Sequence, residues 1–167
     1  RAKDSIDGKS EKYRFVHKLE TKEWIFPNNL FYKKIICSSI IILQNKFFNT
    51  FMRGDPDKIV NLTTNHQEWE RWTLEKENNY LYIKSSHDTY LRADPDKTVN
   101  LTNNRQEWER WTIEKENNYF YIKSVHGTYL RADQHNTINL STTENEWEKW
   151  RKYKYPILYV ARQNTNN

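Results

Sequence analysis

The sequence predicts an all-β protein, and in particular a β-trefoil made of three four-stranded units. One observation behind this prediction is a repeat of about 39 residues, with equivalent positions at Thr50, Thr89 and Thr128. Residues 55–79 and 94–118 are identical at 21 of 25 aligned positions. The other observation is that short stretches of alternating apolar and polar residues fill each repeat. The units are residues 41–79, 80–118 and 119–157.

The second unit shows the expected elements most clearly. Aromatic and β-branched residues favour a strand at residues 80–84, and a tight turn at His87-Asp88 leads to a second strand at 89–93. The sequence Asp-Pro-Asp-Lys that follows is typical of a turn. Alternation then predicts a third strand at residues 99–101 and a fourth at 111–115.

Three such units supply twelve short strands, too few for a solenoid, which indicates closure around a pseudo-threefold axis. A β-trefoil closes in this way. A three-bladed propeller is the alternative, but propellers typically have about four to eight blades. We therefore expect a trefoil domain over residues 41–160, with a C-terminal tail at 161–167.

Two tryptophans three residues apart occur in every unit, in the sequences QEWERWT, QEWERWT and NEWEKWR. The second of each pair precedes an aliphatic residue by two positions in the first two units, as Trp72 precedes Leu74, so it should begin the inward face of the fourth strand. We expect these tryptophans to meet in the core with two repeated apolar sets. The residues are Trp72, Trp111 and Trp150, then Met52, Leu91 and Leu130, then Leu62, Leu101 and Leu140.

The first tryptophan of each pair has two interpretations. Because large aromatic side chains are mostly buried, we expect Trp69, Trp108 and Trp147 to cap the bottom of the barrel. The alternative is that they are partly exposed platforms on which sugar rings stack. The charged residues between the tryptophans, such as Glu70 and Arg71, are expected to be solvated.

Composition and charge exclude several classes. The chain has 27 Lys and Arg against 22 Asp and Glu, and the excess lies mainly at its ends, so the dense basic stripe of a nucleic-acid reader is missing. A single cysteine, Cys37, cannot form a disulfide framework or a zinc cluster. The longest apolar stretch, residues 35–43, is shorter than the about 20 residues of a spanning helix.

The sequence contains no motif of an enzyme, and we expect no catalysis, cofactor or metal. His87 and His126 occupy the same turn in two units, where Phe48 stands in the first, so a packing role is expected for them. Asn-Leu-Thr or Asn-Leu-Ser occurs once per unit and matches the N-glycosylation pattern. We expect these sites to be inert in a cytoplasmic protein.

Residues 1–40 do not follow the repeat and carry nine Lys and Arg against five Asp and Glu. We interpret them as a basic extension, either eroded from an earlier repeat or foreign to the fold, with strands possible at residues 13–16 and 24–26. The residues Tyr-Ile-Lys-Ser, which the other two units have in their first strand, are also missing from the first unit. We therefore expect that strand to be poorly formed and the closure of the barrel to be strained.

These residues together resemble the fascin-type actin-crosslinking repeat. The resemblance rests on His126-Gly127-Thr128-Tyr129-Leu130-Arg131-Ala132, on the Val/Ile-Asn-Leu that follows, and on Trp-Glu-x-Trp-Thr-Ile-Glu. It covers all three units, and hisactophilin is a single-trefoil member of this kind. The resemblance implies a β-trefoil that binds F-actin, and a cytoplasmic, cytoskeleton-associated location.

A second resemblance keeps glycans open as partners. Gln67-Glu68-Trp69 and Gln106-Glu107-Trp108 are similar to the Gln-x-Trp signature of ricin B-type lectins, although Asn145 breaks it in the third unit. A scaffold for another protein is the third possibility. As surface candidates for binding we choose four repeated cations that should face outward on their strands: Lys84, Arg92, Lys123 and Arg131.

Overall fold

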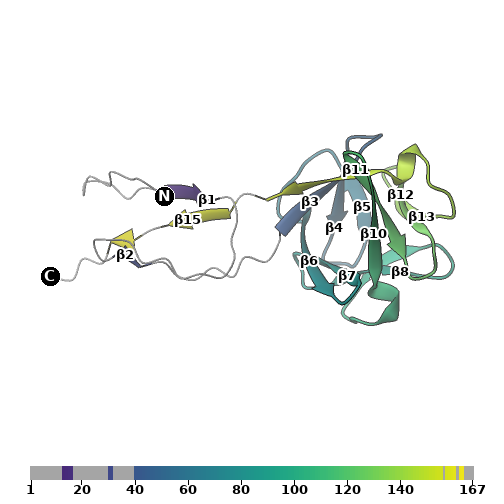
Figure 1. The fold of residues 1–167 in the computed structure, drawn as a ribbon, viewed down its shortest axis with the longest axis horizontal. Coiled ribbons are helices and arrows are strands. Elements are labelled where there is room, and N and C mark those ends of the chain that lie inside the picture. Colours follow the sequence, from purple (N-terminus) through teal and green to yellow (C-terminus); the bar gives the residue numbers. More distant parts are fainter. Residues whose placement is uncertain (1–12, 17–29, 32–39, 156, 161, 164–167) are drawn as a thin grey trace. The chain divides into compact units, whose positions relative to one another are not determined.

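The computed structural model describes residues 13–16, 30–31, 40–155, 157–160 and 162–163. The chain divides into two compact units, of which one is Ser38–Tyr155 and the other combines the two ends of the chain. Figure 1 shows the elements of each unit. The candidate site described below lies in the unit Ser38–Tyr155. No helix among the described residues is long and apolar enough to cross a membrane.

Six antiparallel strands form a closed barrel (Figure 1). Neighbouring strands pair in the order β3, β6, β7, β10, β11 and β14, and β14 returns to pair with β3. The closed ring removes the unpaired edges that an open sheet would expose. The strands are β3 (Ile40–Asn45), β6 (Arg71–Glu77), β7 (Tyr80–Ser85), β10 (Trp111–Glu116), β11 (Tyr119–Ser124) and β14 (Trp150–Lys154).

Three β-hairpins complete this unit, each joined to one strand of the barrel. They are linked to one another through their turns, because Leu62, Leu101 and Leu140 each donate a backbone hydrogen bond of 3.0–3.1 Å to the turn of another hairpin. The hairpins are β4 (Phe51–Gly54) with β5 (Val60–Thr63), β8 (Tyr90–Ala93) with β9 (Val99–Thr102), and β12 (Tyr129–Ala132) with β13 (Ile138–Ser141). Two 3₁₀ turns, η1 (Glu107–Glu109) and η2 (Glu146–Glu148), precede β10 and β14. This all-β arrangement fits a β-trefoil, and the four strands predicted in the second unit are confirmed.

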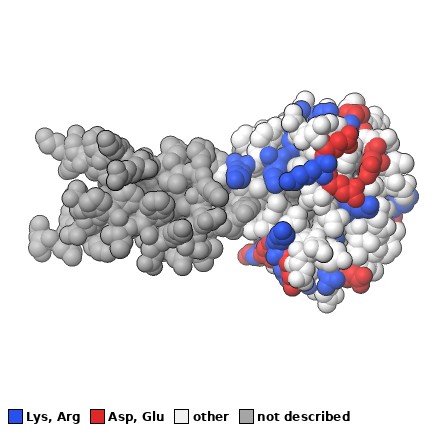
Figure 2. All heavy atoms as spheres, in the orientation of Figure 1, with Lys and Arg blue, Asp and Glu red and all other residues white. Residues whose placement is uncertain are grey.

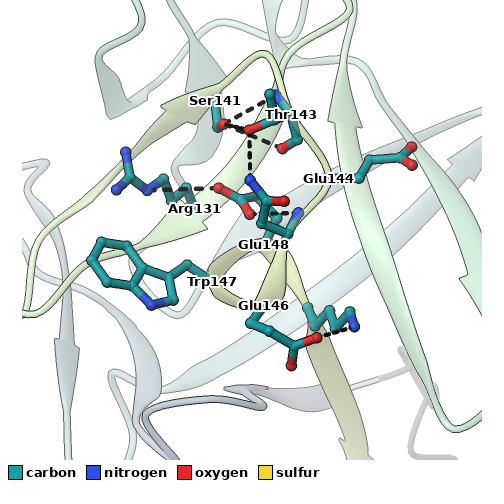
Figure 3. Close-up of a pocket in the computed structure, with 9 residues that line it drawn as sticks. Arg131, Ser141, Thr143, Glu144, Glu146, Trp147 and Glu148 are labelled. Carbon is teal, nitrogen blue, oxygen red and sulfur yellow. Dashed lines mark hydrogen bonds and ion pairs between the residues drawn. The ribbon is translucent and has the colours of Figure 1, made fainter.

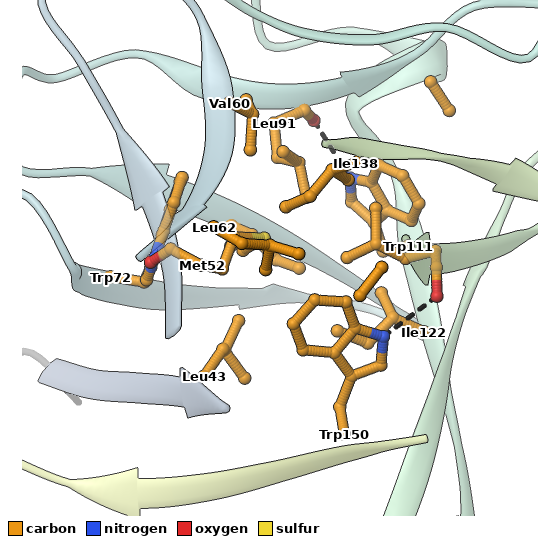
Figure 4. Close-up of a cluster of buried hydrophobic side chains, with 14 of the residues drawn as sticks. Leu43, Met52, Val60, Leu62, Trp72, Leu91, Trp111, Ile122, Ile138 and Trp150 are labelled. Carbon is orange, nitrogen blue, oxygen red and sulfur yellow. Dashed lines mark hydrogen bonds between the residues drawn. The ribbon is translucent and has the colours of Figure 1, made fainter. Parts of the chain in front are cut away.

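The second tryptophan of each pair lies in the core, as predicted. Trp72, Trp111 and Trp150 are fully buried, and both predicted sets of aliphatic residues belong to the same cluster (Figure 4). Each indole N–H donates a hydrogen bond of 2.9 Å to a carbonyl on a hairpin strand, at Met52, Leu91 and Leu130. These bonds satisfy the one polar atom of each buried ring.

The expectation of a poorly formed first strand is wrong. β3 pairs with β14 over five residues, from Asn45 opposite Trp150 to Ile41 opposite Lys154, and with β6 over three. The reason is an insertion of one residue in the following turn. The backbone N–H of Asn45 bonds to Thr50, five residues on, whereas Ser85 bonds to Thr89, only four residues on. Shifted by one position, the apolar residues of β3 meet the core.

The other unit contains two antiparallel pairs of strands. β1 (Tyr13–Val16) pairs with β15 (Ile157–Val160), and β2 (Leu30–Phe31) pairs with β16 (Arg162–Gln163). The strand expected at residues 13–16 is therefore confirmed, and the one expected at 24–26 lies outside the described residues. The limits predicted for the trefoil domain, the extension and the tail stay predictions, as does the origin of residues 1–40.

Candidate functional site

The first tryptophan of each pair lies under an arginine from the neighbouring hairpin. The guanidinium carbon of Arg53 is 4.4 Å from the ring centre of Trp69. Arg92 lies 4.7 Å from Trp108 in the same way, and Arg131 lies 4.6 Å from Trp147. A cation over an indole face is an attractive arrangement. One face of each ring is thus covered by a positive charge.

A buried glutamate holds each arginine in place. Glu70, Glu109 and Glu148 are only 2–3% exposed and lie 3.6–3.9 Å from the guanidinium groups of Arg53, Arg92 and Arg131. Each carboxylate also accepts a backbone N–H three residues before it, at 2.5–2.9 Å, and so caps the short turn that carries the tryptophan. The prediction of solvated charges between the tryptophans is therefore wrong for the glutamates.

A residue from a neighbouring turn completes each cluster. The ring of His87 lies edge-on to Trp69 at 5.4 Å, and His126 lies in the same way against Trp108 at 5.6 Å. Phe48 packs against Trp147 at 5.3 Å. The packing role predicted for the histidines is confirmed, and no cluster of metal ligands forms among the described residues.

The first tryptophan of each pair is less buried than the second, and its place at the bottom of the barrel stays a prediction. These first tryptophans lie outside the buried cluster, between a hairpin arginine and a turn, and Trp108 is 36% exposed. Trp69 and Trp147 are partly buried, so all three rings keep some of the exposure that the alternative interpretation requires. However, the arginine already covers one ring face, so a sugar could stack there only after the arginine moved.

Beside Trp147 is a pocket of about 520 Å³ (Figure 3). Arg131 and Trp147 flank it on one side and Glu144 on the other. Ser141, Thr143 and Asn145 form a hydrogen-bonded group in its wall, in which the Asn145 side chain donates to the Thr143 hydroxyl at 2.9 Å. Hydroxyl, amide and carboxylate groups beside an aromatic ring can bind a hydroxyl-rich ligand.

The four predicted cations have different surroundings. Lys84 lies 2.8 Å from Asp88, and the hydrogen bond between them raises the pKa of Lys84. Lys123 lies 3.0 Å from Glu114, whose hydrogen bond likewise raises the pKa of Lys123. Each lysine is therefore held in its charged form and partly neutralised by a neighbour.

The two arginines, in contrast, belong to the tryptophan clusters. Arg92 lies 2.7 Å from Asp94 in addition to its contact with Glu109. The structure thus joins Arg92 with Trp108 and Arg131 with Trp147, and it leaves the two lysines beside Tyr90 and Tyr129 instead. Sequence reasoning did not find the buried glutamates. The pattern Gln-Glu-Trp-Glu, with a polar residue three positions before Glu, is the capping signal that could have found them.

A closed barrel of six strands with three attached hairpins is the architecture of a β-trefoil. The family model of the fascin domain matches residues 55–151, more than half of the chain, and the chain belongs to this family. No curated protein is significantly similar to it in sequence.

Among solved structures, SeviL bound to asialo-GM1 saccharide is similar with a TM-score of 0.64. The two chains share 17% identity over 71% of this chain and 98% of SeviL. At this identity the likeness shows the fold alone.

Proposed function

We propose that this protein binds actin filaments in the cytoplasm and has no catalytic activity. The observation that carries the proposal is its membership of the fascin-domain family over residues 55–151. The fascin-type repeat that the sequence resembles is found in proteins that bind F-actin. We also infer that the three units are related by a pseudo-threefold axis.

The charge of the chain favours an acidic partner. The formal net charge is +5, and long-range attraction to a polyanion speeds association and weakens with salt. Of the four candidate cations, Arg131 is the one whose nearest carboxylate among the described residues is the most distant, with Glu148 at 3.6 Å. Lys84, Arg92 and Lys123 each have a carboxylate within 3.0 Å, which reduces their attraction for a partner.

Co-sedimentation with F-actin tests the proposal. The full chain should pellet with filaments at low salt, and less of it should pellet as the salt concentration rises. Pelleting of the chain alone in the absence of actin is the control. A chain that stays in the supernatant at every actin concentration would contradict filament binding.

Saccharide binding is the second candidate, and the pocket beside Trp147 favours it. Ser141, Thr143, Asn145 and Glu144 place donors and acceptors around one partly buried indole. The similar fold of a saccharide-bound protein is consistent with this function. A glycan array is the matching experiment, with Trp147→Ala as the variant that should abolish any signal. Trp69→Ala, in the first unit, is the matched control that should keep it.

A further inference from the structure

The three pairs of barrel strands that close the repeats have very different outer faces. We call β6–β7 the first seam, β10–β11 the second and β14–β3 the third. The registers align residue for residue: Thr73 faces Lys84, Thr112 faces Lys123, and Arg151 faces Gln44. Residues at the same register position in the three seams are therefore equivalent and can be compared directly.

In the first two seams, carboxylates neutralise the outer face. Glu75 contacts Lys84 and Arg105, and Glu77 contacts Arg105 at 2.6 Å. In the second seam, Glu114 contacts Lys123 and accepts a hydrogen bond from Tyr129. Both faces therefore have most of their charges paired within the chain.

The third seam has no carboxylate at these positions. Tyr153 occupies the place of Glu75 and Glu114, and Tyr155 the place of Glu77 and Glu116. Tyr153 is 46% exposed, and its hydroxyl donates to Gln44 at 3.1 Å. Arg151 has no ion pair with any residue of the described part of the chain.

Two exposed lysines also lie on β14, but they alternate with Arg151 and Tyr153 and therefore point to the opposite face of the strand. Lys152 and Lys154 lie on the same strand and have no carboxylate within ion-pair distance among the residues of the structure that are described. On the upper part of the face shown in Figure 2, Lys and Arg side chains gather, and Asp and Glu side chains lie to their right and also along the lower part of the domain. The outer face of the third seam therefore combines an exposed tyrosine and an arginine, without the carboxylates of the other two seams.

We propose that the third seam is the surface that contacts the actin filament. Tyr and Arg are enriched at protein interfaces, where charged residues of the rim steer a partner of opposite sign. The missing carboxylates and the positive charge of Arg151 fit an acidic protein surface. This inference rests on the proposed function, and it assigns the contact to one seam of three.

Converting the third seam to the chemistry of the other two tests the proposal. The double variant R151T/Y153E places Thr and Glu where the first two seams already have them, so it should fold. Its affinity for F-actin should fall by about tenfold or more, the loss expected when central interface residues are replaced. The matched control T112R/E114Y makes the reciprocal change in the second seam and should bind as tightly as the unmodified chain or more tightly.

Co-sedimentation of the three proteins separates the two proposals. If the unmodified chain pellets with actin and R151T/Y153E pellets equally well, the third seam is not the contact, and filament binding stands. If the unmodified chain does not pellet, filament binding is wrong and the seam assignment falls with it. Urea unfolding of R151T/Y153E confirms that any loss of binding occurs in a folded protein.

Discussion

The side chain of Asn45 donates a hydrogen bond of 2.8 Å to the carbonyl of Trp147, which lies 102 residues later in the chain. The same amide also donates to the carbonyl of Lys149, and its oxygen accepts the backbone N–H groups of Phe47 and Phe48. Asn45 is fully buried. One amide therefore joins the longer turn after β3 to the turn that carries the site.

Replacing this amide should destabilise the barrel. Asn45→Ala leaves buried donors and acceptors at both turns without partners, and each such group costs about 1–3 kcal/mol. We expect the free energy of unfolding in urea to fall by about 3 kcal/mol. Asn103→Ala, in an exposed loop, is the control. An equal effect of the two substitutions would show that the link does not stabilise the barrel.

The same residue shows why the first strand could not be placed from the sequence. Asn45 occupies the position of Ser85 and Ser124 opposite the buried tryptophans, but it lies one residue out of step with the repeat. A slip of one residue moves every side chain of a strand to the other face, so alignment without a gap puts the wrong residues inside. The length of the turn sets this register, and the residues of the strand itself do not indicate it.

The tryptophans of the core, in contrast, could be predicted. Trp72 and Trp111 each precede an aliphatic residue by two positions, and period two fixes the face of a strand. Glu109 could not be distinguished from Glu107 in this way, because both flank Trp108 in an irregular turn. Arg92 and Glu109 are 17 residues apart in the sequence, and only the folding of the hairpin brings them into contact. The sequence alone could therefore not predict this part of the site.

Glu109 and Glu107 make a matched pair for testing the buried carboxylate. Glu109→Ala removes the acceptor for the Gln106 N–H and the partner of Arg92, and we expect a loss of about 2–3 kcal/mol in the free energy of unfolding. Glu107→Ala alters an exposed residue of the same turn and should change it by less than about 0.5 kcal/mol. Thermal or urea unfolding measures both. Equal losses would refute a special role for the buried carboxylate.

Gly54 should not tolerate substitution by alanine, although Ala93 and Ala132 occupy the equivalent positions of the other two hairpins. A Cβ atom at Gly54 would lie 2.8 Å from Cη2 of Trp72 and 3.0 Å from Cδ1 of Leu101. Gly→Ala in a strand ordinarily stabilises by roughly 0.5–1 kcal/mol. Here crowding of the packed core reverses the sign, and we expect Gly54→Ala to cost about 1–3 kcal/mol.

The equivalent position in the second hairpin provides the control for Gly54. Ala93→Gly should also destabilise, by roughly 0.5–1 kcal/mol, because it loosens a strand without crowding. Urea unfolding of both variants measures the difference. A Gly54→Ala protein more stable than the unmodified chain would mean that the ring of Trp72 moves aside at little cost.

Stability should decline at alkaline pH through Tyr121. This side chain is 5% exposed, and burial, with a smaller contribution from Glu116, raises its pKa from 10.0 to about 12. The unfolded chain therefore loses the phenol proton first. The stabilisation by the neutral phenol is fully present below pH 10 and is lost as the pH rises through about 12.

Urea unfolding at a series of pH values, with tyrosinate absorbance followed in parallel, measures this effect. Tyr121→Phe has no phenol to ionise, so its free energy of unfolding should fall less steeply than that of the unmodified chain between pH 10 and 12. Tyr153→Phe removes the hydroxyl of an exposed tyrosine and should leave the steep fall in place. If Tyr121→Phe kept the full alkaline slope and Tyr153→Phe flattened it, the buried phenol would not be the group that sets the decline.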